Sequence, residues 1–140
     1  FALPGDQENF GFTYGFARFF VANDSPDDPA ALTGAIPAAI DADFTEHASA
    51  RWKLLMHHRP MWSSGTRHGS NTTLQASWGP IVDKYHVDLV LNGHEHPYEI
   101  SYPLAGGGGQ AANATGTVYG RAGGAGGGGS TTSKTATPAS

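Results

Sequence analysis

The stretch Val87-Asp88-Leu89-Val90-Leu91-Asn92-Gly93-His94-Glu95-His96 decides the fold that we expect for this chain. Its near-continuous apolar residues predict a strand covered on both faces, as in a parallel or mixed sheet between helices. Gly93 then lets the backbone turn tightly before two imidazoles that stand two residues apart. Ligand sites in such sheets gather at the carboxyl ends of the strands, where paired histidines can bind one metal ion or two adjacent ones. Two loop histidines without any ligand fit the bare motif about equally well.

A second apolar run delivers histidine in the same way. Residues 52–56 run into His57-His58-Arg59-Pro60, where the proline ends the strand ladder. Six of the seven histidines fall within residues 57–96. Two strand ends that both present imidazole are what a metal centre at the edge of an α/β sheet requires.

The remaining periodicity predicts the elements around these two strands. A helix expected over residues 74–85 joins strands 52–57 and 87–92 into a βαβ unit, which should be right-handed. Residues 12–23 predict two paired strands with a glycine at their turn. Residues 41–50 predict at most a short amphipathic helix.

Composition limits the classes of function. With 140 residues the chain has room for one domain with a modest core. A net charge of −4 and a pI near 5.9 give no argument for nucleic acid or an anionic membrane surface. No apolar run approaches the ~20 residues of a membrane span, and the first residues do not form a signal peptide. The absence of cysteine excludes disulfides and thiolate ligands, and leaves His, Asp, Glu and Asn as metal ligands.

The composition changes along the chain and predicts three regions. Residues 1–104 are expected to form an α/β domain that contains the strand pair, the histidine-bearing strand, the helix and the Gly-His-Glu-His turn. Residues 105–129 are rich in glycine and are expected to be partly ordered against the core. Residues 130–140 are rich in Ser, Thr and Pro and predict a flexible tail.

Ordered motifs between residues 10 and 125 resemble the C-terminal half of a calcineurin-like metallophosphoesterase, closest to the purple acid phosphatases. The matching elements are the strand pair Phe12–Val21, His58-x-Pro60-x-Trp62, Ser63-Ser64-Gly65, His68-Gly69-Ser70, the helix at 74–85, Gly93-His94-Glu95-His96 with Tyr98-Glu99, and Gly116-Thr117-Val118-Tyr119. The resemblance implies an α/β fold, namely the C-terminal half of a β-sandwich flanked by helices (αββα).

The resemblance also implies roles for the histidines in a two-metal site that hydrolyses phosphoesters. His58 and His94 would share one metal ion, and His96 would bind its neighbour. His68 matches a histidine that faces the substrate and contacts phosphate oxygens or protonates the leaving alkoxide, although a solvated loop histidine is the alternative. His57 should point to the opposite face of its strand, as a supporting residue or an alternative ligand. The metals would be Fe, Zn or Mn.

Two aromatic residues and three asparagines complete the candidate residues. Trp62 and Tyr98 are packing aromatics that could line the cleft. Asn23, Asn71 and Asn113 stand in Asn-x-Ser/Thr sequons. Together with the resemblance, these glycosylation candidates favour a secreted, periplasmic or extracellular protein.

The carboxylate and asparagine motifs of the family's two-metal site do not occur in this sequence. We therefore expect the chain to supply the histidine half of the site, to be inactive alone, and to act on a phosphate monoester or diester when completed. The N-terminal half of the same domain, or self-association, would complete it through an uncovered apolar face and an unpaired edge at strand 52–57 or 87–92. A truncated non-catalytic module and a structural, self-assembling extracellular protein remain alternatives.

Overall fold

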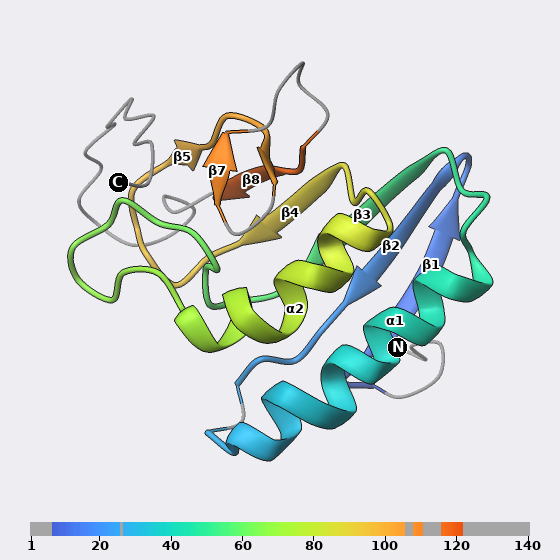
Figure 1. The fold of residues 1–140 in the computed structure, drawn as a ribbon, viewed down its shortest axis with the longest axis horizontal. Coiled ribbons are helices and arrows are strands. Elements are labelled where there is room, and N and C mark those ends of the chain that lie inside the picture. Colours follow the sequence, from blue (N-terminus) through green and yellow to red (C-terminus); the bar gives the residue numbers. More distant parts are fainter. Residues whose placement is uncertain (1–6, 26, 106–107, 111–115, 122–140) are drawn as a thin grey trace.

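The computed structural model describes residues 7–25, 27–105, 108–110 and 116–121. Their order along the chain is β1 (Phe10–Tyr14), β2 (Ala17–Val21), the π-helix η1 (Ala31–Ala35), α1 (Ile36–Glu46), β3 (Trp52–Met56), α2 (Thr72–Lys84), β4 (Leu89–Asn92), β5 (Glu99–Ile100), β6 (Leu104–Ala105), β7 (Gly109–Gln110) and β8 (Val118–Arg121). The main sheet has the strand order β1-β2-β3-β4-β8-β5, and β6 pairs with β7 separately. Figure 1 shows α1 and α2 side by side in front of this sheet. The mixed α/β class that the sequence predicts is therefore confirmed.

The sheet is parallel in its centre and antiparallel at its two edges. β2, β3, β4 and β8 are parallel neighbours, whereas β1 and β5 run antiparallel to theirs. The unit β3–α2–β4 confirms the predicted crossover. The predicted strand pair is confirmed as well, with Gly15 at φ 59° in its turn, a left-handed conformation that glycine adopts without steric cost.

Both helices begin earlier than the sequence predicts. α1 starts at Ile36 rather than near residue 41, because Ile36, Ile40 and Phe44 recur at helical spacing and are all buried. Pro37 is compatible with this start, since the first helical turn needs no N–H partner there. The start of α2 is set by Asn71, whose side-chain oxygen accepts a hydrogen bond from the Leu74 N–H at 3.0 Å.

The expectation of an unpaired edge at strand 52–57 or 87–92 is wrong. β3 lies between β2 and β4, and β4 lies between β3 and β8. β8 fills the far side of β4 through the register Leu89↔Val118. Because β8 comes from a short motif beside glycine-rich sequence, its local pattern alone does not predict that it pairs with β4. The edges of the main sheet are β1 and β5.

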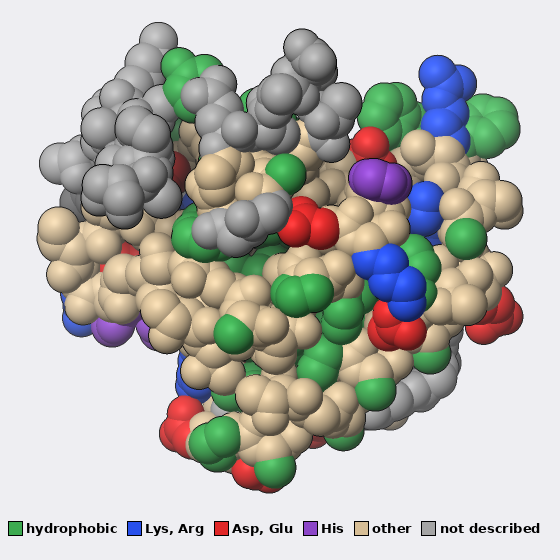
Figure 2. Space-filling view, in the orientation of Figure 1, with side chains coloured by type: hydrophobic (Ala, Val, Ile, Leu, Met, Phe, Trp, Pro, Cys, Tyr) green, Lys and Arg blue, Asp and Glu red, His purple; other side chains and the backbone are tan. Residues whose placement is uncertain are grey.

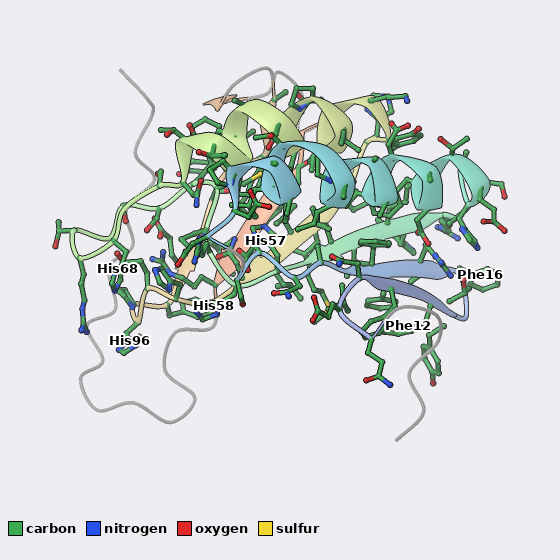
Figure 3. The ribbon with its side chains drawn as sticks, turned by 90° about the horizontal axis from the view of Figure 1, so that it is seen from below. Phe12, Phe16, His57, His58, His68 and His96 are labelled. Carbon is green, nitrogen blue, oxygen red and sulfur yellow. The ribbon has the colours of Figure 1, made fainter. Side chains whose placement is uncertain are left out.

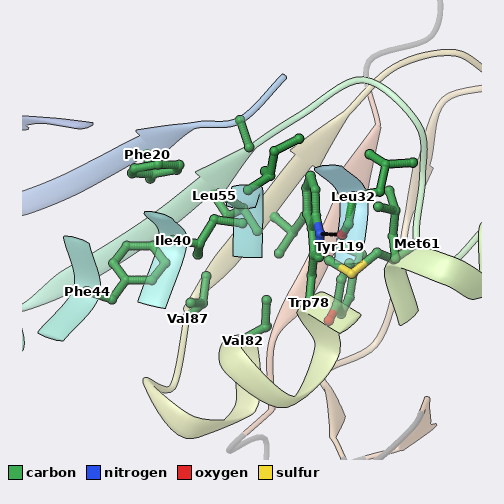
Figure 4. Close-up of a cluster of buried hydrophobic side chains, with 14 residues drawn as sticks. Phe20, Leu32, Ile40, Phe44, Leu55, Met61, Trp78, Val82, Val87 and Tyr119 are labelled. Carbon is green, nitrogen blue, oxygen red and sulfur yellow. Dashed lines mark hydrogen bonds between the residues drawn. The ribbon is translucent and has the colours of Figure 1, made fainter. Parts of the chain in front are cut away.

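The core lies between the helices and one face of the sheet (Figure 4). Its members are Phe20, Ala22, Leu32, Ile36, Ile40, Phe44, Leu55, Met61, Leu74, Trp78, Val82, Val87, Val90 and Tyr119. The Trp78 indole donates a hydrogen bond to the Leu32 carbonyl at 2.8 Å, which joins α2 to η1. Each large apolar side chain removed from water contributes roughly 1.5–3 kcal/mol, so this layer dominates the stability of the sheet and helices.

The opposite face of the sheet carries a second apolar surface. Strand side chains alternate between faces, so the neighbours of the core residues point away from the helices. In register across five strands, Phe12 pairs with Phe19, Phe19 with Leu54, Leu54 with Leu89 and Leu89 with Val118. We call the apolar face the set Phe10, Phe12, Tyr14, Ala17, Phe19, Val21, Trp52, Leu54, Met56, Leu89, Leu91 and Val118. No helix in the described ranges covers it, and Figure 3 shows both helices on the other side.

The outer surface of the helix layer has a different character. In Figure 2 hydrophobic, acidic, basic and neutral side chains are interspersed over this side, with no large area of one charge. This distribution is typical of a solvated surface. Among the described residues, no helix is long and apolar enough to cross a membrane.

Candidate metal and phosphoester site

His58 and His94 face each other at the carboxyl ends of β3 and β4. His58 Nε2 lies 3.1 Å from His94 Nδ1, and the ring centroids are 5.0 Å apart. His94 stands at φ 66°, a left-handed conformation that is uncommon outside glycine. A Cβ on the preceding Gly93 would lie 3.4 Å from His58 Nδ1, so glycine leaves room for the imidazole. The structure therefore brings together the two histidines to which the family resemblance gives one shared metal ion.

The distance between these two nitrogens is suitable for a shared ion. Two nitrogen ligands about 2.0–2.1 Å from one metal, at angles between octahedral and tetrahedral, lie about 2.9–3.4 Å apart. Partial burial lowers the pKa of the His94 imidazole, and the nearby charges of His68 and His58 lower it further. A lowered pKa favours the neutral imidazole, which is the form that binds metals. No group of three or more acidic or histidine side chains in the described part of the chain could hold a metal ion, so this pair is an incomplete set.

His68 lies directly beside this pair, on the loop between β3 and α2. Its ring centroid is 4.2 Å from that of His94. A hollow opens next to the two rings and is lined by His68, Gly69, Ser70, Asn71, Thr72 and His94. The first residues of α2 form one side of it, and unpaired N–H groups at a helix N-terminus favour an anion. A phosphate group therefore suits this hollow electrostatically.

His96 is exposed, two residues beyond His94. In Figure 3 it lies at the same end of the molecule as His58 and His68, opposite the end that carries Phe16. Within the described residues no hydrogen bond or ring contact joins it to the other three. The candidate ligand of the second metal is thus near the site but is not in contact with the pair.

His57 points in the opposite direction from His58, into the helix layer. Its side chain is fully buried, with Nδ1 3.3 Å from Asp24 Oδ2 and its ring edge-on to Trp78. Its Nε2 has no partner among the described residues. Strand alternation thus separates the two adjacent histidines, which supports a structural role for His57.

Asp24 is a site residue that the sequence reasoning missed. It is buried, and its carboxylate accepts the His58 N–H at 3.1 Å and the Arg59 N–H. Burial alone would raise the pKa of this carboxyl group, but the hydrogen bond with His57 and the two backbone N–H groups hold the pKa below its usual value. Its position could have indicated this role, because Asp24 lies just beyond β2 and β2 is the parallel neighbour of the strand that leads to His58.

Glu95, the middle residue of the turn, was also missed as a functional candidate. Its side chain is buried and accepts hydrogen bonds from the backbone of the His68 loop. Burial acts to raise the pKa of Glu95, but the N–H groups of His68 and Gly69 outweigh it, and the pKa is lowered. A charged residue between two histidines reads as exposed in the sequence, so no local pattern indicates this role.

The remaining candidates lie in several places. Trp62 lines a different hollow, together with Pro80, Leu104 and Tyr119, and not the one between His68 and His94. Tyr98 is 55% exposed. Among the sequons, Asn23 is half-buried and its side chain donates to Glu8, Asn71 caps α2, and Asn113 lies outside the described residues. The predicted tail 130–140 and most of the glycine-rich segment also lie outside them.

Comparisons with known proteins identify the family of the chain. The family model for calcineurin-like phosphoesterases matches residues 4–98, and the chain belongs to that family. It is 38% identical over 63 residues to an acid phosphatase of Aspergillus ficuum, covering 45% of this chain and 10% of that protein. It is 34% identical over 70 residues to purple acid phosphatase 3 of Arabidopsis thaliana, covering 44% and 19%. The resemblance read from the sequence is thereby confirmed.

A solved structure extends the similarity to the fold. Purple acid phosphatase PPD1 from yellow lupin (Lupinus luteus) seeds superposes with a TM-score of 0.69 at 23% identity, over 89% of this chain and 24% of that one. The superposition confirms the fold. The chain spans only about a tenth to a fifth of the length of the curated relatives it matches.

Proposed function

We propose that His58, His94 and His96 are the histidine half of a two-metal site that hydrolyses phosphate esters. The observation that carries the proposal is the 3.1 Å approach of His58 Nε2 to His94 Nδ1, beside a hollow that suits an anion. Membership of the phosphoesterase family and similarity to acid phosphatases support it. His58 and His94 would hold one ion and His96 the other, and Fe, Zn or Mn suits nitrogen ligands without thiolate.

The chain's own residues would bind and orient the substrate. When bound, the metal ions supply charge neutralisation at the phosphate and activation of a water. The N-terminus of α2 would attract the anionic ester. His68, 4.2 Å from the His94 ring, would hold a proton towards the leaving oxygen and release it as the ester bond breaks. A phosphate monoester or diester is the substrate class that fits these groups.

The apolar face supports the view that the site is completed by another layer. Two sheets pack about 10 Å apart, with interdigitated apolar side chains between them. His58 lies on the apolar side of β3, since His57 points into the helix layer. A second sheet on this face would bring its own strand ends, with carboxylate ligands, to the edge where His58 and His94 stand. We propose the N-terminal half of the same domain as that layer, with self-association as the alternative.

Metal binding to the 140-residue chain tests the site. Cobalt(II) should bind weakly, because only two ligands stand together, and its visible spectrum reports nitrogen coordination. His94→Ala should abolish the binding, whereas His86→Ala, which removes an exposed histidine at the end of α2, should not. Equal binding by the His94→Ala chain would refute the assignment.

Activity and association test the half-site. The isolated chain should not turn over p-nitrophenyl phosphate with Zn²⁺, Mn²⁺ or Fe, and turnover that a chelator removes would overturn that expectation. Leu54→Ser in the centre of the apolar face should reduce association in sedimentation, whereas Thr33→Ser on the exposed side of η1 should not. A monodisperse 14.6 kDa species that unfolds cooperatively would count against the proposal that a second layer covers the apolar face.

The three sequons favour a secreted or extracellular setting, which glycan analysis of the native protein would check.

A further inference from the structure

The side chain of Glu95 leaves the Gly-His-Glu-His turn in the direction of the protein interior. It is 3% exposed although it stands between two exposed or half-exposed histidines. Its Oε1 accepts the Gly69 N–H at 2.9 Å and also the His68 N–H. A single carboxylate oxygen therefore joins the turn that carries His94 to the loop that carries His68.

Gly65 encloses the same carboxylate from another side of the loop. A Cβ at Gly65 would lie 2.6 Å from Glu95 Oε2, much closer than real Cβ contacts. The backbone thus passes the carboxylate so closely that only glycine fits without displacement. The loop between β3 and α2 contacts the Glu95 carboxylate at Gly65 and at His68-Gly69. Its backbone is therefore shaped around this side chain.

Arg121 of β8 links the beginning of the His68 loop to the residues that directly follow the Gly-His-Glu-His turn. It is also 3% exposed. Its Nη1 donates to Ser63 Oγ at 2.5 Å and its Nε to the Pro97 carbonyl at 3.0 Å. It also pairs with Glu99, whose Oε1 accepts the Ser64 N–H at 2.9 Å. With its start held by Arg121 and its far part held by Glu95, the loop has little freedom to move relative to the turn.

We infer that Glu95 is a positioning residue that holds His68 against His94. Hydrogen bonds to a charged acceptor are stronger than neutral ones, and here both donors are backbone groups at and beside the residue to be placed. The distance between His68 and His94 is then set by Glu95, the residue that directly follows His94. Its relevance to catalysis rests on the proposed function, whereas the positioning itself concerns only this chain.

Nuclear magnetic resonance of the 140-residue chain tests this without metal or turnover. In the unaltered chain we expect cross-relaxation between the His68 and His94 ring protons and slow exchange of the His68 and Gly69 amides. Glu95→Ala should abolish the ring contact and speed exchange of both amides about tenfold or more. Glu95→Gln keeps an acceptor oxygen and should restore most of both signals, whereas Glu95→Met keeps similar volume without the acceptor and should not; a purely bulk-packing role would predict recovery in both.

A second variant keeps the Glu95 carboxylate and disturbs the loop backbone beside it. Gly65→Ala places a methyl group against Glu95 Oε2 and should weaken the same two signals, whereas Gly79→Ala, with no atom within 4 Å of its Cβ, should leave them unchanged. If Glu95→Ala does not fold, the Gly65→Ala result decides. Ring contact and amide protection that persist in a folded Glu95→Ala or in Gly65→Ala would overturn the inference. Loss of cobalt binding is a separate readout, so failure of the proposed metal site would be recognised independently.

Discussion

Replacing His57 or His58 by alanine should have opposite effects, although the two residues are adjacent. The His57 side chain is fully buried between Asp24 and Trp78. His58 is exposed and directed at His94. We expect His57→Ala to destabilise the fold and spare metal binding, and His58→Ala to do the reverse.

The magnitude follows from what each side chain leaves behind. Without His57, the buried Asp24 carboxylate loses one partner and a cavity opens beside Trp78. A lost hydrogen bond to a charged group costs about 1.5–3 kcal/mol, and the cavity adds about 1.5–2 kcal/mol. The sum of about 3–5 kcal/mol is a large part of the roughly 5–15 kcal/mol that stabilises a typical domain. Without His58, only an exposed ring is lost, and such changes usually stay within about 0.5 kcal/mol.

Urea unfolding followed by tryptophan fluorescence measures the first effect. With a slope of about 2 kcal/mol per molar urea, His57→Ala should lower the midpoint by roughly 1.5–2.5 M and His58→Ala by less than about 0.3 M. Cobalt titration of the folded variants measures the second effect. All three chains should be compared at one protein concentration, because association stabilises the folded form. Equal midpoint losses, or cobalt binding that survives in His58→Ala and disappears in folded His57→Ala, would refute the assigned directions.

Three further predictions concern stability. Burial raises the pKa of the Tyr119 phenol to about 12. Stability from its neutral form is therefore complete below pH 10 and should fall by about 2 kcal/mol by pH 12, a loss that unfolding of Tyr119→Phe should not show. Asn71→Ala removes the cap of α2 and should cost about 0.5–2 kcal/mol in thermal unfolding. Trp78→Phe loses the hydrogen bond to Leu32 and should cost about 1–3 kcal/mol, whereas Trp52→Phe on the exposed rim should cost less than about 0.5 kcal/mol in the same assay.

Local patterns in the sequence predict the elements whose signals are themselves local. The apolar run before Gly93 and the proline after His58 mark two strand ends, and parallel strands place such ends at one edge of a sheet. Alternation along β3 correctly separates His57 from His58. These inferences need only neighbouring residues and the geometry of a strand.

The parts that could not be predicted depend on contacts between distant segments. β8 joins the centre of the sheet through hydrogen bonds to β4, and nothing in its short sequence specifies that partner. Asp24 and Glu95 are charged residues whose buried roles arise from loops that fold over them. Sequence patterns assign such residues to the surface, because an isolated buried carboxylate is costly and only its tertiary partners offset that cost.

The backbone of His94 carries a cost that the fold itself does not require. At φ 66° the residue occupies a conformation that costs an ordinary side chain about 1–2 kcal/mol and costs glycine almost nothing. Glycine at position 94 would remove this strain, but glycine also loses more backbone freedom on folding than any other residue. His86, at φ 50°, carries a similar strain without any proposed ligand, so the strain at His94 gains functional meaning only through the His58 ring that its imidazole faces.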